Sequence, residues 1–139
     1  MSQYKVMIVD DDTNSRAVLS DALGGESYTL LEAVNGQQAL ELANEELPDL
    51  ILLDVMMPGM DGGVGILHKL GGVGVLRKLK EQEQTRSIPV IMVTALNLAL
   101  QEAACMDEGA TDYICKPFSA MVMRSRVRAA LRNRPIATA

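Results

Sequence analysis

Carboxylates, a hydroxyl and a lysine stand directly after short apolar runs that are typical of buried strands. The acidic run Asp10-Asp11-Asp12 follows one such run, and Asp54 follows the run Leu50–Leu53. Two later runs lead into Thr94-Ala95 and into Lys116-Pro117. If these runs form parallel strands, their carboxyl ends meet at one edge of a sheet, where ligands bind. The pattern therefore predicts a polar site at that edge.

A cluster of this kind suits a metal ion and a phosphoryl group. Neighbouring carboxylates raise one another's pKa unless a cation lies between them. Oxygen ligands favour a hard ion, and bound Mg²⁺ is commonly completed by phosphate oxygens. A lysine and a hydroxyl stabilise phosphoryl oxygens, and a carboxylate such as Asp54 can be the nucleophile that forms an aspartyl phosphate. For Asp12 and Asp61 we favour simpler roles, as a helix cap and a turn residue.

The period of the apolar pattern changes repeatedly along the chain, which predicts alternating strands and helices. The expected strands are Tyr4–Val9, Tyr28–Val34, Leu50–Asp54, Ile88–Thr94 and Asp112–Cys115. The expected helices are Thr13–Leu23, Asn35–Leu47, Leu98–Glu108 and Ser119–Arg134, with one more from a repeated segment described below. This alternation predicts right-handed βαβ units, and so an α/β fold with a five-stranded parallel sheet covered by helices on both faces.

Length and composition favour one globular domain. The chain has 139 residues, of which 48% are hydrophobic and 22% charged. We expect the domain to span residues 1–134 and residues 135–139 to be a tail or linker stub. Neither a membrane-spanning run nor a signal peptide is evident, which favours the cytoplasm. Cys105 and Cys115 are too few for a disulfide framework and are expected to be packed thiols.

Charge is distributed unevenly. The net charge is −5, yet all 18 acidic residues precede Tyr113, whereas the last helix is basic. Its arginines are Arg124, Arg126, Arg128, Arg132 and Arg134. We interpret this helix as a solvated face whose charge complements its own C-terminus. The acidic body and scarce aromatic residues argue against direct binding of nucleic acid.

Four stretches of the chain resemble the receiver domains of two-component response regulators. They are Val6–Asp12, Leu52–Gly62, Ile88–Ala95 and Gly109–Phe118. The resemblance covers nearly the whole chain, and its motifs occur in order at the expected strand ends. It implies a flavodoxin-like, doubly wound (βα)5 fold with strand order 2-1-3-4-5.

The resemblance also implies roles for individual residues. Asp54 would accept a phosphoryl group from a histidine kinase or a histidine phosphotransfer protein. The implied Mg²⁺ ligands are Asp11, Asp54, the backbone carbonyl of Met56 and, through water, Asp10. The implied phosphoryl-binding and switch residues are Thr94, Ala95, Lys116 and Tyr113, with a cis peptide bond between Lys116 and Pro117. The domain would catalyse only its own phosphorylation and dephosphorylation, and would not be an enzyme acting on other substrates.

A nine-residue tandem repeat departs from the family pattern. Residues 62–70 read GGVGILHKL and residues 71–79 read GGVGVLRKL, with seven of nine positions identical. Nine residues make about 2.5 helical turns, so in one continuous helix the two apolar faces would point in opposite directions. We predict a break near Gly71-Gly72, with the second copy as the third helix and the first as a loop or short helical turn. The converse assignment stays open at this point.

The repeat can be interpreted as a neutral insertion or as a functional element. We favour a tolerated surface insertion, because long loops add little entropy cost. The functional alternatives are shielding of Asp54, altered docking of partners, or a dimer contact. His68, the single histidine, lies in the first copy and is expected on the surface.

Other interpretations concern partners and chemistry. Leu98 and Leu100 lie so close together that one should fall outside the core. This suggests a homodimer or partner contact on the face made by residues 98–108, 112–115 and 119–134; the alternative is a single exposed leucine, which is common on protein surfaces. One alternative function is a degenerate receiver, an interaction module that is not phosphorylated. Another is a Mg²⁺-dependent phosphohydrolase, which would carry a second aspartate where Met56 stands.

Overall fold

The protein is an α/β domain with its sheet between two helical layers. The structure, a computed structural model, describes residues 3–57, 71–95 and 99–132. Its five parallel strands are β1 (Lys5–Val9), β2 (Thr29–Ala33), β3 (Leu50–Leu53), β4 (Val90–Thr94) and β5 (Asp112–Cys115). They pair in the order β2-β1-β3-β4-β5. The predicted doubly wound fold and its strand order are therefore confirmed.

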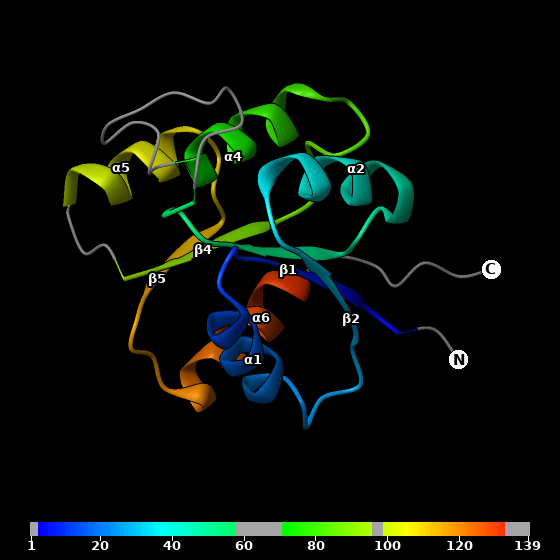
Figure 1. The fold of residues 1–139 in the computed structure, drawn as a ribbon, viewed down its shortest axis with the longest axis vertical. Helices are drawn as coiled ribbons and strands as arrows, with labels where there is room; N and C mark the ends of the chain where they lie inside the picture. The colour runs from blue at the N-terminus through cyan, green and yellow to red at the C-terminus, as the bar shows by residue number, and fades with distance from the viewer. Residues whose placement is uncertain (1–2, 58–70, 96–98, 133–139) are drawn as a thin grey trace.

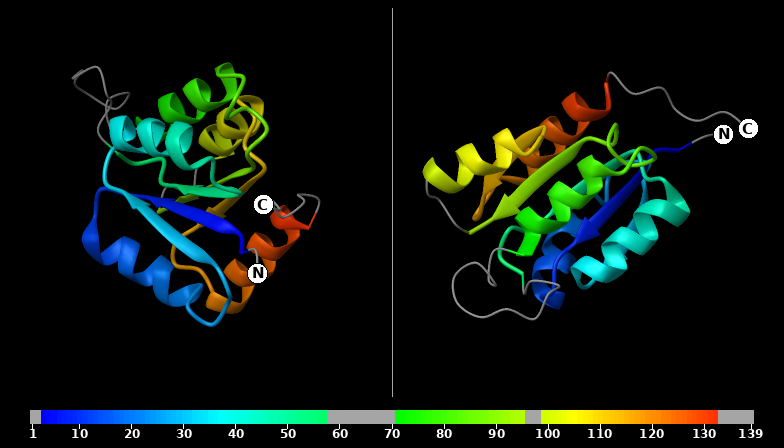
Figure 2. Two further views of the ribbon diagram at one scale, coloured as in Figure 1. Left: turned by 90° about the vertical axis from the view of Figure 1, so that its right-hand side faces the viewer. Right: turned by 90° about the horizontal axis from the view of Figure 1, so that it is seen from above.

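Helices cover both faces of the sheet (Figures 1 and 2). On one face lie α1 (Thr13–Ala22) and α6 (Ala120–Leu131). On the other lie α2 (Gly36–Glu46), α4 (Gly71–Glu81) and α5 (Ala99–Asp107). No helix in the described ranges is long and apolar enough to cross a membrane.

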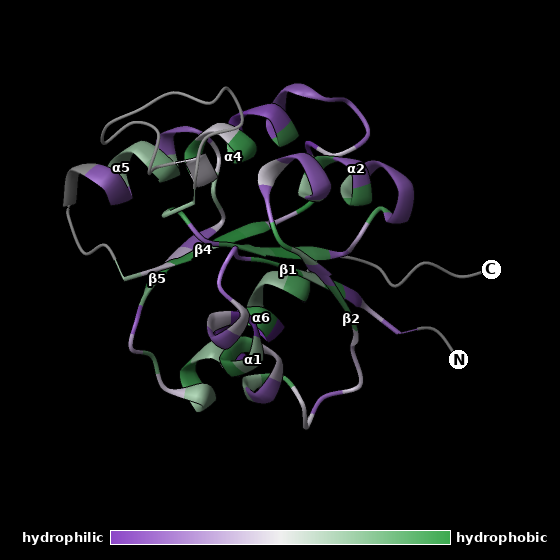
Figure 3. Ribbon diagram, viewed as in Figure 1, coloured by the Kyte–Doolittle hydropathy of each residue, from purple (hydrophilic) through white to green (hydrophobic). Residues whose placement is uncertain are grey.

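The alternation of side chains along each strand builds two cores, one on each face of the sheet. On β1, Val6 and Ile8 pack towards α1 and α6, whereas Met7 and Val9 pack towards the other three helices. All four residues of β3 are buried, as expected for a central parallel strand. The apolar colouring of the central strands and of the inward helical faces follows this division (Figure 3).

Several helix ends follow from local chemistry. Asp12, Asn35 and Ser119 are the N-caps of α1, α2 and α6, and each side chain accepts a backbone N–H of the first turn. The cap role predicted for Asp12 is thus confirmed. Helix α2 ends at Glu46 and is capped by Leu47, which takes a left-handed conformation with φ 45° directly before Pro48. A proline there cannot continue the helix, so the chain turns into β3.

The second copy of the repeat forms α4, as predicted. Helix α4 begins at Gly71 and buries Gly72, Val75, Leu76 and Leu79 in the core beside α2 and α5. The first copy, including His68, lies outside the described residues, and so do Asp61 and Leu98. The side chain of Leu100 is likewise not described.

The basic last helix contacts the acidic body of the protein. Arg126 donates two hydrogen bonds to Asp112, each 3.0 Å long, and Arg128 pairs with Glu26 at 2.8 Å. Arg124 donates to the carbonyl of Ala22 at the end of α1. These three arginines therefore help to seat α6 on the sheet and on α1. The two exposed ion pairs, made by Arg126 and Arg128, contribute modestly to the stability of the fold, on the order of 0.5 kcal/mol each.

The loop after α4 is tied to the helix by a buried threonine. The hydroxyl of Thr85, fully buried, donates to the carbonyl of Leu79 over 2.6 Å. We expect Thr85→Val to lower the free energy of unfolding by about 2 kcal/mol, because a buried carbonyl loses its partner while the side-chain volume is kept. Urea denaturation measures this loss. Thr29→Val, which removes a surface hydrogen bond to Gln3, should change stability by no more than about 0.5 kcal/mol. Equal effects of the two substitutions would contradict the expectation.

Candidate functional site

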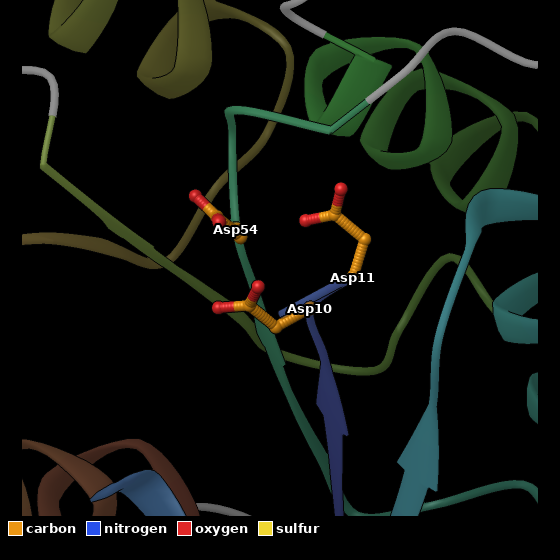
Figure 4. A group of neighbouring side chains, drawn as sticks. All are labelled: Asp10, Asp11 and Asp54. Carbon is orange, nitrogen blue, oxygen red and sulfur yellow. The ribbon is translucent and has the colours of Figure 1, made fainter. Parts of the chain in front are cut away.

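The polar residues predicted at the strand ends meet at one edge of the sheet. The strands run parallel, and their registers pair Val9 with Leu53, Leu53 with Met92 and Thr94 with Cys115, so the residues that follow β1, β3 and β5 emerge at the same edge of the sheet. Figure 4 shows Asp10 and Asp11 beyond the end of β1, with Asp54 beyond the end of β3 and the three carboxylates around a shared space.

Three of the predicted residues form a cluster of carboxylates. One oxygen from each of Asp10, Asp11 and Asp54 lies within 4.8 Å of the others. Asp10 and Asp54 are buried, with 1% and 8% of their surface exposed, whereas Asp11 is exposed. The donor set consists of oxygen alone and is open to solvent on one side. It fits a hard divalent ion such as Mg²⁺, which retains water ligands.

Electrostatics at Asp54 also fit a cation. Burial raises the pKa of Asp54 to about 6, and the charge of Asp10 adds to the rise. A hydrogen bond of 3.0 Å from the Met56 backbone N–H and the charge of Lys116 act in the opposite direction. Since burial and the charge of Asp10 disfavour the ionised carboxylate, a bound cation would lower this pKa and favour the ionised form.

Lys116 reaches into the same space from the end of β5. Its Nζ lies 3.1 Å from Oδ2 of Asp10 and 3.8 Å from Oδ2 of Asp54, and it donates to the hydroxyl of Ser15 at 3.3 Å. The peptide bond to Pro117 is cis. The lysine is thus positioned among acceptors at the carboxylate cluster, where a phosphoryl group on Asp54 would find a positive charge.

The remaining predicted residues belong to β4, to the position directly after it, and to β5. Thr94 is fully buried at the end of β4, and its carbonyl accepts the N–H of Lys116 at 2.7 Å. Ala95 follows it and is exposed. Tyr113 is half-buried on β5 against the core that contains α4 and α5, and burial raises the pKa of its hydroxyl to about 12. Tyr113 therefore remains a neutral side chain at physiological pH.

Two residues of α1 at this edge were not predicted. Ser15 contacts Lys116, and Arg16 donates to the backbone carbonyl of Asp10 at 2.9 Å. Both belong to the first turns of the helix that follows the acidic run. Their positions five and six residues beyond Asp10 could have suggested them, because a helix that starts at the end of β1 begins beside the site.

The fold and site define a signalling domain of known type. Residues 6–128 match the family model of the response regulator receiver domain, and the chain belongs to this family. It is 38% identical over 128 residues to the response regulator PleD of Caulobacter vibrioides, covering 92% of this chain and 26% of PleD. It is 39% identical over 128 residues to the phosphate regulon transcriptional regulatory protein PhoB of Pseudomonas aeruginosa, covering 92% of this chain and 52% of PhoB.

Solved structures agree with this assignment. A response regulator from Desulfuromonas acetoxidans superimposes with a TM-score of 0.79 at 28% identity, covering 95% of this chain and 99% of that one. The chain spans about half the length of PhoB and about a quarter of PleD.

Proposed function

We propose that the domain accepts a phosphoryl group on Asp54 in a two-component phosphorelay, with a histidine kinase or histidine phosphotransfer protein as donor. The observation that carries this proposal is the position of Asp54, which is buried within 4.8 Å of two other carboxylates and 3.8 Å from a lysine. Membership in the receiver family supports the same function. The proposal does not extend to turnover of other substrates.

In the proposed reaction, an oxygen of Asp54 attacks the phosphorus of a phosphohistidine. The new O–P bond forms as the P–N bond breaks, and the imidazole nitrogen keeps the electron pair of that bond. Lys116 stabilises the negative charge of the transferred oxygens, and the Thr94 hydroxyl donates to one of them. Bound Mg²⁺, held by Asp11, Asp54, the Met56 carbonyl and, through water, Asp10, would supply further charge neutralisation.

Phosphorylation would then act as a local change in charge that biases a two-state element. Lys116 now contacts Asp10 and Ser15, and it would be drawn towards the phosphoryl group. Movement of Thr94 towards that group would leave room for Tyr113 to turn inward. The face made by α5, β5 and α6 would carry the change to a partner or to a second copy of the chain.

We expect the protein to gain one phosphoryl group when it is incubated with acetyl phosphate and Mg²⁺. Intact-protein mass spectrometry measures the adduct. Asp54→Asn should form none, because the amide is not a nucleophile under these conditions. Asp49→Asn is the matched control: Asp49 lies at the opposite end of β3 and accepts the Lys5 N–H at 2.8 Å, which an asparagine oxygen can also do. Asp49→Asn should be phosphorylated normally.

The same assay separates the alternatives. Absence of any adduct in the presence of Mg²⁺ would favour a degenerate receiver that acts as an interaction module. Continuous release of phosphate from varied phosphoesters would favour a phosphohydrolase. An adduct that persists in Asp54→Asn would place the modification elsewhere and overturn the assignment of Asp54.

A further inference from the structure

We propose that Arg16 is a positioning residue for the Mg²⁺ ligands Asp10 and Asp11, an inference that rests on the proposed metal site. Arg16 lies on α1 with only 13% of its side chain exposed. Its Nη1 donates to the Asp10 carbonyl at 2.9 Å, and its Nε donates to Oε1 of Glu32 at 3.0 Å. The guanidinium therefore links the loop after β1 to the neighbouring strand β2.

The contact completes a set of bonds that determines the orientation of Asp10. Its N–H donates to the carbonyl of Ala33, its Oδ1 accepts the N–H of Asp12, and its Oδ2 faces Lys116. The backbone carbonyl is the one further acceptor of the residue, and Arg16 occupies it. Each polar group of Asp10 thus has a directional partner.

The hydrogen bond from Arg16 to the carbonyl of Asp10 also affects the orientation of the next residue, Asp11. The peptide group between Asp10 and Asp11 is planar, so a bond to its oxygen restricts the rotation of the whole plane. Asp11 directly follows that peptide plane. Its side chain is exposed, so packing restrains its orientation little. Arg16 consequently sets the direction in which the Asp11 carboxylate enters the site. Partners of this kind, one step removed from a metal, commonly affect its affinity.

Geometry and not charge is the decisive property of Arg16. Glu32 pairs with the guanidinium and offsets much of its charge, whereas Lys116 supplies the positive charge inside the site. An arginine can donate to two acceptors in fixed directions, and a lysine acts as a compact point charge. A lysine at position 16 should therefore keep the fold and lose the alignment.

Calorimetric titration of the phosphate-free protein with Mg²⁺ tests this inference. We expect Arg16→Lys and Arg16→Ala to bind Mg²⁺ roughly tenfold more weakly than the unaltered chain, by analogy with other partners of metal ligands. Arg77→Lys is the matched control, because Arg77 pairs with Glu108 on the exposed surface of α4 at 3.1 Å. It should bind Mg²⁺ with unchanged affinity. Unfolding curves without metal establish that each variant is folded at the titration temperature.

The outcomes distinguish this inference from the proposed function. Mg²⁺ binding by folded Arg16→Lys that equals that of the unaltered chain would overturn the role of Arg16 and leave the metal site intact. Failure of the unaltered chain to bind Mg²⁺ would overturn the metal site and the role of Arg16 together. If Arg16→Ala does not fold, Arg16→Lys alone decides the result.

Discussion

Replacing Asp54 with asparagine should make the metal-free protein more stable at pH 8, although it removes the proposed phosphorylation site. Asp54 is buried next to Asp10, and both burial and that charge oppose its ionisation in the folded protein. Asparagine has nearly the same shape and carries no charge. We expect the free energy of unfolding to rise by about 1–2 kcal/mol, given that each pKa unit corresponds to 1.36 kcal/mol and that partial solvent access reduces the effect.

The direction of the pH dependence follows from the same pKa. The pKa of Asp54 is raised from 3.8 to about 6, so the folded state holds its proton more tightly than the unfolded state. This favourable contribution is fully present below about pH 4 and is lost as the pH rises through 6. The advantage of Asp54→Asn should therefore be small at about pH 4, grow as the pH rises from 3.8 to about 6, and reach its full size above about pH 7.

Urea denaturation at pH 5 and pH 8 in the presence of EDTA measures this difference. Mg²⁺ should reverse the order of stability at pH 8, because the ion stabilises the folded protein with Asp54 far more than the asparagine variant. Asp49→Asn, which replaces a carboxylate at the opposite end of β3, serves as the control for a general effect of removing a carboxylate. A metal-free Asp54→Asn that is less stable than the unaltered chain at pH 8 would contradict the electrostatic account.

Gly72→Ala should be the most damaging substitution in α4. A Cβ at this position would lie 2.0 Å from the carbonyl oxygen of Asp54 and 2.7 Å from Cα of Val55. Both are backbone atoms, so the helix itself must shift. The N–H groups of Gly71 and Gly72 donate to the carbonyls of Met57 and Val55, and the shift would break these bonds as well. We expect a loss of about 3 kcal/mol in the free energy of unfolding and slower phosphorylation by acetyl phosphate.

Gly74→Ala is the matched control in the same helix. A Cβ there meets nothing within 4 Å, and alanine favours a helix by roughly 1 kcal/mol over glycine. It should therefore stabilise the protein slightly. Chemical denaturation of the two variants gives the comparison, and equal stabilities would refute the close approach at Gly72.

The tandem repeat calls for one additional variant. Gly63 holds the same place in the first copy as Gly72 holds in the second. If the first copy can take the helix position when the second is damaged, Gly72→Ala alone will cost much less than Gly63→Ala combined with Gly72→Ala. If it cannot, the two will be equally unstable.

Much of the fold and the grouping of the site residues were predictable from the sequence. Alternating periods imply βαβ units, and parallel strands necessarily bring their carboxyl ends to one edge. Asp10, Asp54 and Lys116, which each follow an apolar run, were bound to meet there. Polar residues that directly end buried strands are therefore a dependable local signal.

Only the tertiary structure decided how that edge is held together. Both copies of the repeat carry nearly the same sequence, so local propensity alone cannot choose between them. The predicted break near Gly71-Gly72 left the converse assignment open; the structure places the second copy in α4, with Gly72 against the Asp54 backbone. The contacts of Arg16 also depended on tertiary packing, because its partners lie in the loop after β1 and on β2 and come together only when the sheet forms. Strand ends can be read along the chain, but contacts between distant segments depend on packing.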